Sequence, residues 1–139
     1  MRIKALYILL ISLCFSFSAK AQNADAIVKE ITGYFKASNT SQIAENFAST
    51  VELVILTDED VYSKVQAEII LKDFLSKHSP ISAKLIHLLD SNPNYRFAVI
   101  SLKTGNGDFR VSYSLKETGG RYLITDMRIE LEKEISERS

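Results

Sequence analysis

The sequence has one cysteine, two prolines, five glycines, two histidines and no tryptophan. Cys14 lies within the first 21 residues, which have the pattern of a signal peptide, so the mature chain can have no disulfide, cysteine nucleophile or thiolate zinc site. Paired-histidine metal motifs, phosphate-binding loops, dinucleotide fingerprints and the Gly-x-Ser-x-Gly motif are also missing. We therefore expect neither a metal nor a cofactor.

The N-terminal segment has the three parts of a secretory signal. Arg2 and Lys4 give a basic start, an apolar stretch follows, and Ala19-Lys20-Ala21 has the Ala-x-Ala form of a cleavage site. The apolar stretch is shorter than the about 20 residues that a membrane span needs. We expect a signal peptide over residues 1–21, export to the periplasm or outside the cell, and no membrane span after cleavage.

Residues 22–139 have the length of one domain with a single core. Without the three basic residues of the signal, 14 basic residues face 17 acidic ones, a net charge of −3. A mildly acidic domain lacks the basic stripe that nucleic-acid binding needs, so nucleic acid is not an expected partner.

Helical spacing dominates the first half of the mature chain. Apolar residues recur at three- or four-residue intervals over Asp25–Ala37, with Asn23 as a candidate cap, and a short second helix is expected over Ser41–Phe47. Tyr62, Ser63 and Lys64 could form a small catalytic group, but Ser63 with Gln66 also matches a capping box, and we favour the start of a third helix.

The rest of the chain is rich in β-branched and alternating residues. A strand is expected over Thr50–Thr57, then a turn at Asp58-Glu59-Asp60 with a short pairing strand at Val61-Tyr62. Four further strands are expected over Ala83–Leu89, Tyr95–Thr104, Asp108–Glu117 and Arg121–Leu131. Helices followed by antiparallel strands predict an α+β domain with its helices on one face of a curved sheet.

Alternation along the last strands assigns residues to the two faces of the sheet. Asn106-Gly107 predicts a two-residue hairpin that pairs Leu102 with Val111 and Ile100 with Tyr113. Pairing Leu115 with Leu123 and Val111 with Met127 then requires a three-residue Thr-Gly-Gly loop with a bulge. The resulting inner face is apolar and predicts a pocket for a small apolar ligand, lined by Leu102, Phe109, Val111, Tyr113 and Met127.

The same registers leave apolar side chains on the outer face. These are Tyr95, Phe97, Val99, Tyr122 and Ile124. Because a contiguous apolar patch often marks a protein contact, we expect a homodimer packed through this face, with scattered surface hydrophobes as the alternative.

Catalytic groups are scarce on the inner face. The first hypothesis is thus a non-catalytic exported domain that binds a small apolar ligand or an envelope protein. The alternative is an isomerase or hydrolase with His87 as base and Tyr113 as proton donor in the hollow. His78, at the expected end of the third helix, is interpreted as a partner of the last carbonyls.

Three segments together resemble a known family. They are VELVILTDEDVYSKVQAEIILKDFL (Val51–Leu75), LIH (Leu85–His87) and NGDFRVSYSLKETGGRYLITDMRIE (Asn106–Glu130). They resemble the exported bacterial family called domain of unknown function 4783, in the nuclear-transport-factor-2-like superfamily. The resemblance implies a cone-shaped α+β fold, in which a third helix closes a hollow against a curved sheet, and it implies no activity.

Overall fold

The structure is a computed structural model that describes residues 23–138. The expected signal peptide lies outside these residues. In chain order the elements are α2 (Ala24–Lys36), α3 (Thr40–Glu45), β1 (Phe47–Ile55), β2 (Asp58–Ser63), α4 (Lys64–Lys77), β3 (Pro80–Asn92), β4 (Tyr95–Thr104), β5 (Gly107–Thr118), β6 (Arg121–Leu131) and α5 (Glu132–Arg138). Within the described range, no helix has the length and hydrophobicity of a membrane span.

The two N-terminal helices begin at asparagine caps. The Asn23 side chain accepts a hydrogen bond from the Asp25 backbone N–H at 3.0 Å, as the sequence predicts, and Asn39 does the same for Gln42 at 3.3 Å. The second helix is shorter than expected because Phe47 opens β1 instead of ending α3. Both helices turn their apolar sides, which include Ile31 and Ile43, into the core.

The capping box predicted before α4 is present. Ser63 Oγ accepts from the Gln66 backbone N–H at 3.2 Å, and Gln66 Oε1 accepts from the Ser63 backbone N–H at 3.3 Å. From this start, Ala67, Leu71 and Phe74 bring one side of α4 into the core. Strand β2 thus passes into helix α4 at the three residues Tyr62, Ser63 and Lys64.

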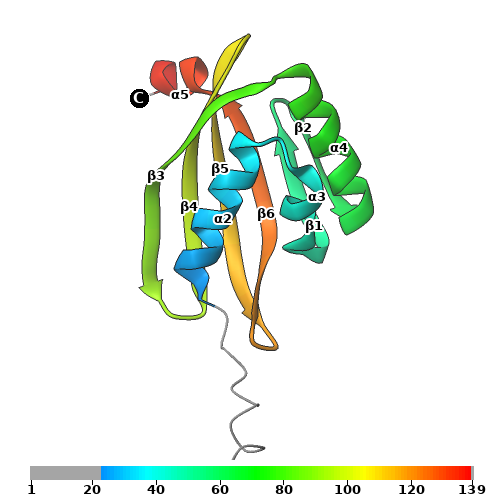
Figure 1. The fold of residues 1–139 in the computed structure, drawn as a ribbon, viewed down its shortest axis with the longest axis vertical. Coiled ribbons are helices and arrows are strands. Elements are labelled where there is room, and N and C mark those ends of the chain that lie inside the picture. The colour runs from blue at the N-terminus through cyan, green and yellow to red at the C-terminus, as the bar shows by residue number, and fades with distance from the viewer. Residues whose placement is uncertain (1–22, 139) are drawn as a thin grey trace, which may run out of the picture.

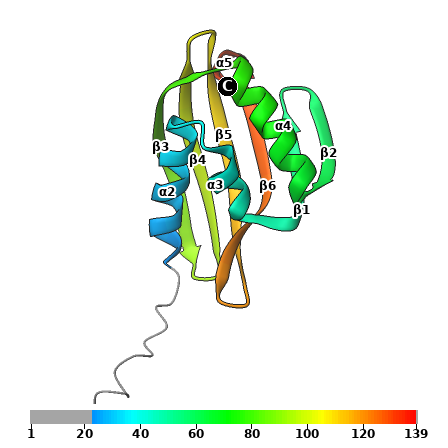
Figure 2. The same ribbon diagram turned by 45° about the vertical axis from the view of Figure 1, so that its right-hand side comes forward.

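Six strands form one sheet in the order β2-β1-β6-β5-β4-β3. All neighbours are antiparallel except β1 and β6, which pair in parallel with Leu53 beside Met127 and Ile55 beside Ile129. Figures 1 and 2 show α2, α3 and α4 on one face of this curved sheet. The predicted α+β class and the cone with helices on one face are therefore confirmed.

The acidic triplet of Asp58, Glu59 and Asp60 does not form the predicted turn. These residues belong to β2 and pair with Ile55, Val54 and Leu53. The chain turns earlier, at Leu56 and Thr57, where Leu56 takes a positive φ of 57°. Because β2 is an exposed edge strand, its carboxylates can extend into water while the backbone pairs with β1.

The β5–β6 hairpin differs from its predicted register. Gly119 and Gly120 have φ values of 59° and 82°, as a two-residue turn with two positive φ angles requires, and Thr118 pairs with Arg121. Leu115 therefore pairs with Ile124, not with Leu123. The irregularity lies further along β6, where Ser114 pairs with Asp126 and Thr125 is the extra residue of a bulge.

The β4–β5 hairpin is shifted by two residues from its predicted register. Gly105 and Asn106 form the loop, Thr104 pairs with Gly107, and Leu102 pairs with Phe109 instead of Val111. A shift of two residues preserves the faces of both strands, since side chains alternate with a period of two. The predicted inner face of this hairpin is therefore correct although its pairs are not.

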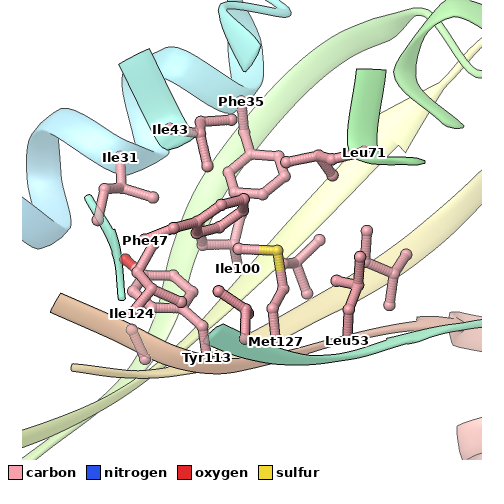
Figure 3. Packing of buried hydrophobic residues seen from close by; sticks show 14 of the residues in the cluster. Ile31, Phe35, Ile43, Phe47, Leu53, Leu71, Ile100, Tyr113, Ile124 and Met127 are labelled. Carbon is pink, nitrogen blue, oxygen red and sulfur yellow. The ribbon is translucent and has the colours of Figure 1, made fainter. Parts of the chain in front are cut away.

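The core lies between the sheet and the three helices. In Figure 3, Phe35, Ile43 and Leu71 come from the helices and meet Tyr113 and Met127 from the sheet. Tyr113 is 0% exposed, and its hydroxyl has no hydrogen-bond partner among residues 23–138. Burial raises the pKa of this phenol well above its ordinary value of about 10.

Candidate functional site

A groove of about 640 Å³ opens between α4 and the β1–β2 hairpin. Figure 2 shows these elements side by side at one edge of the molecule. Its apolar lining includes Leu53, Ile55, Ile70, Phe74 and the ring of Tyr62. The volume falls within the range of small-molecule sites, roughly 300–1,000 Å³.

His78 closes the end of the groove where α4 stops. Its ring centroid lies 4.6 Å from that of Phe74, with an interplanar angle of 31°, and 4.9 Å from that of Phe109, with an angle of 69°. Phe74 and Phe109 themselves meet edge to face at 5.1 Å. The imidazole is thus held as the third member of an aromatic cluster at the margin of the core.

Asn106, from the β4–β5 loop, fixes the hydrogen positions of this imidazole. Asn106 Nδ2 donates to the Lys77 carbonyl at 3.0 Å, which sets the orientation of the amide. The amide oxygen, an acceptor only, lies 3.0 Å from His78 Nδ1. His78 Nδ1 must therefore carry the hydrogen, and in the neutral ring Nε2 holds the free lone pair.

The polar rim of the groove carries more acid than base. Asp73 forms an ion pair with Lys77 at 3.0 Å, and both side chains are about two-thirds exposed (63% and 68%). Asp58 and Glu59 also line the groove, and neither forms an ion pair with any residue from 23 to 138. The rim therefore has a surplus of two negative charges.

The side chains that line the groove suit the binding of a ligand better than catalysis. His78 Nε2 can accept one hydrogen bond, and the Tyr62 hydroxyl has no hydrogen bond within residues 23–138. No serine, threonine or carboxylate forms a hydrogen bond with His78 in this range, so a nucleophile paired with a base is not assembled here. In the described part of the chain, no three His, Cys, Asp or Glu side chains gather to hold a metal ion.

The pocket predicted on the inner face is filled by its own lining. Leu102, Phe109, Val111, Tyr113 and Met127 are all at most 1% exposed and pack in the hydrophobic core. Residues with so little surface accessible to water leave no room beside them for a ligand. Phe109 connects this region to the groove through its contacts with Phe74 and His78, and Met127 does so through its pairing with Leu53.

The structure separates the predicted catalytic pair. Tyr113 pairs with Ala98, and His87 pairs with the next residue of β4, Val99. Because successive residues of a strand point to opposite faces, Tyr113 lies on the inner face and His87 on the outer face. His87 is exposed and Tyr113 is buried, so the expectation that both face one hollow is wrong.

Three of the five predicted outer-face residues do lie together. Tyr95, Phe97 and Val99 occupy the outer face of β4, where Phe97 pairs with the 61% exposed Leu89 of β3. Tyr122 is half-buried and packs against the core.

Ile124 does not lie on the outer face. It is 0% exposed in the core because the Thr125 bulge reverses the alternation that had placed it outside. We define the outer patch as Leu89, Tyr95, Phe97 and Val99.

Sequence reasoning missed His78 as a groove residue. Its position after α4 predicts interaction with the last carbonyls, yet its side-chain partners are Asn106 and Phe109, about thirty residues away, and Phe74, four residues before it. The four-residue spacing of Phe74 and His78 is the local signal for this position, because residues so spaced lie next to each other on a helix. Asn106 and Phe109 give no such signal, since they approach His78 only in the folded chain.

Comparison with known proteins agrees with this architecture. The family model of Domain of unknown function (DUF4783) matches residues 28–130. A DUF4783 family protein from Bacteroides uniformis superposes with a TM-score of 0.69 at 27% identity, covering 73% of this chain and 93% of that chain. The corresponding protein from Bacteroides ovatus gives a TM-score of 0.69 at 25% identity, covering 73% and 91%. No curated protein matches the sequence.

More distant structures share the fold alone. An uncharacterized protein with a cystatin-like fold from Caulobacter vibrioides has a TM-score of 0.61 at 12% identity, covering 83% of this chain and 92% of that chain. The resemblance inferred from the three sequence segments is thereby confirmed: the chain belongs to the DUF4783 family, and its fold is the nuclear-transport-factor-2-like, cystatin-like cone.

Proposed function

We propose that the protein is an exported, non-catalytic binding domain that takes a small molecule in the groove between α4 and the β1–β2 hairpin. The observation that carries this proposal is the contrast between a filled core and an open groove of about 640 Å³ with an apolar floor and a polar rim. Burial of a ligand against such a floor, with a few polar groups to orient it, is the usual design of small-molecule sites.

Export is supported by the basic, apolar and Ala-x-Ala parts of residues 1–21. Cleavage after Ala21 would leave the Asn23 cap and the whole of α2 in the mature protein. The destination is the periplasm or the exterior of the cell.

Binding in the groove can be tested by asking whether a small molecule remains bound to the protein during its purification. Native mass spectrometry of protein prepared from its own host should detect a bound small molecule. Thr57→Trp, which adds a large ring at the exposed rim of the groove, should abolish its retention. Thr118→Trp places the same ring at the exposed end of β5, outside the groove lining, and should leave retention unchanged. Absence of a bound molecule, or its retention by Thr57→Trp, would argue against binding in the groove.

The outer patch supports a homodimer packed face to face through the sheet. Tyr95 donates to Ser114 Oγ at 3.0 Å, and Ser114 donates to Asp126 Oδ1 at 3.0 Å, so the phenol is held on the surface of the sheet beside Phe97. The same face carries Asp126 and Arg128, one charge of each sign. A twofold axis through such a face can set apolar residues against each other and pair opposite charges.

Light scattering at high micromolar concentration tests the dimer. The unchanged protein should have the mass of two chains, and Phe97→Lys should have the mass of one, because it would bury an unpaired ammonium at the interface. Val65→Lys is the matched control, since Val65 is 65% exposed on α4, on the helical side of the sheet. A single-chain mass for the unchanged protein would remove the dimer from the proposal.

A further inference from the structure

We propose that the groove selects amphipathic organic cations, namely small amines with an aromatic or aliphatic body. This inference rests on the proposed function, because it names the class of molecule that the same groove would take. It follows from three properties of the lining: an apolar and aromatic floor, an excess of carboxylates at the rim, and hydrogen-bond acceptors at fixed positions.

The apolar floor of the groove favours a ligand with an apolar body. Leu53 and Phe74 present the margin of the core, and Ile70 and Tyr62 are half-buried beside them. Burying an apolar body against these side chains is favourable by about 25 cal/mol per Å². The aromatic rings add an attraction for a cation placed near their faces, which an anion would not experience.

The acidic rim of the groove favours a ligand with a positive charge. Asp73 is occupied by Lys77, whereas Asp58 and Glu59 lack a basic partner anywhere in the described range. Both residues line the groove at the start of β2. The Asp58 side chain shares the face of its pair Ile55, beside the apolar floor, and the Glu59 side chain shares the opposite face with its pair Val54. A ligand whose body rests on Phe74 can therefore bring its ammonium group near Asp58, with Glu59 at a longer range. A carboxylate in the same place would be repelled by Asp58 and, at a longer range, by Glu59.

The polar atoms of the lining favour a ligand with hydrogen-bond donors. Because Asn106 holds the hydrogen on His78 Nδ1, neutral His78 offers only an acceptor at Nε2. The Tyr62 hydroxyl can accept as well as donate. An ammonium or hydroxyl hydrogen satisfies the Nε2 acceptor of neutral His78, whereas a carboxylate oxygen cannot. The Tyr62 hydroxyl can bind either kind of group, so the preference for a donor comes from His78 and agrees with the charge of the rim.

Three probe molecules of nearly the same shape can separate the contribution of charge to binding from the contribution of apolar burial. Tyramine carries an ammonium, para-ethylphenol is neutral, and phloretate carries a carboxylate on an otherwise similar phenol. Isothermal titration of the purified protein should give the tightest binding for tyramine and the weakest for phloretate. The expected difference between the two ions is about ten-fold, as two exposed carboxylates would supply.

Variants locate the effect at the rim. The double variant Asp58→Asn/Glu59→Gln should weaken tyramine binding about five-fold and leave para-ethylphenol unchanged. Asp90→Asn/Glu117→Gln removes two exposed carboxylates outside the groove lining and should change neither probe. Since all four side chains are exposed, these variants should fold normally, and circular dichroism checks this.

The outcomes separate this inference from the proposed function. Equal binding of the three probes at a site that Thr57→Trp blocks would overturn selection for cations and support the groove as a binding site. Failure of all three probes to bind would overturn the inference, and the native mass spectrometry of the unchanged protein and of Thr57→Trp would then decide on the groove alone. Preference for tyramine that survives the rim double variant would also overturn the inference, because the charge would then act elsewhere.

Discussion

Replacement of Phe109 by alanine should lower the free energy of unfolding by about 3–5 kcal/mol. The Phe109 ring is 1% exposed, so its removal would leave a cavity in the core beneath α4. It also meets Phe74 and His78 edge to face, and both contacts would be lost. Chemical denaturation followed by circular dichroism measures the change, since the protein has no tryptophan to report by fluorescence.

Phe109→Leu is the graded control for this prediction. Leucine keeps most of the buried volume but loses the aromatic contacts, so we expect a loss of about 1–1.5 kcal/mol. The alanine variant should also weaken any ligand bound in the groove, because His78 would lose one of its two ring neighbours. A loss below about 1 kcal/mol for Phe109→Ala would mean that the aromatic cluster contributes little to the core.

Alkaline pH should destabilise the protein through Tyr113. Burial raises the pKa of this phenol in the folded state, so the hydroxyl stays protonated there when the same residue in the unfolded chain ionises. The stabilising contribution is therefore complete below the unfolded pKa of about 10 and is lost as the pH rises above it. The loss approaches about 1.4 kcal/mol for each pH unit.

Tyr113→Phe isolates this effect from other groups that titrate in the same range. Denaturation at about pH 8 and about pH 11 should give a smaller loss of stability for the variant than for the unchanged protein. At the lower pH the variant should be at least as stable, because it removes a buried hydroxyl without a hydrogen-bond partner in the described structure. Parallel loss of stability in both proteins would indicate that the Tyr113 hydroxyl is hydrated in solution.

Most of the helices and strands could be predicted from residues that lie close together in the sequence. The Asn23 cap, the Ser63–Gln66 capping box and the bounds of β4 and β6 follow from residues close to one another in sequence. The apolar side of α4 is likewise readable from its three- and four-residue spacing. Such features depend on interactions within one turn or one strand, and the rest of the fold does not override them.

The pairing registers of the strands were harder to predict, because each register depends on which type of turn joins the two strands. Gly119 and Gly120 can form a tight two-residue turn, and the strand then needs a bulge at another place to keep its apolar side inward. The bulge occurs at Thr125, a residue without any local mark of one. Ile124 consequently moved from the predicted outer patch to the core, while Tyr95, Phe97 and Val99 kept their face.

The candidate site itself could not be predicted from spacing. His78 gains its role from Asn106 and Phe109, which the β4–β5 hairpin brings to the end of α4. Likewise the groove is lined by residues of β1, β2 and α4 together, so it appears only when these elements have packed. His87, the more obvious candidate in an apolar strand, lies exposed beside Val99 instead.

The parallel pairing of β1 with β6 has a consequence for the order of events during synthesis. β1 ends at Ile55, whereas its neighbour in the sheet begins at Arg121, so the ribosome must complete almost the entire chain before the two strands can meet. Contacts of such long range slow folding, because the entropy of closing the intervening loop is lost first. If the protein is exported as proposed, we expect this late pairing to favour passage of the still unfolded polypeptide through a translocation channel.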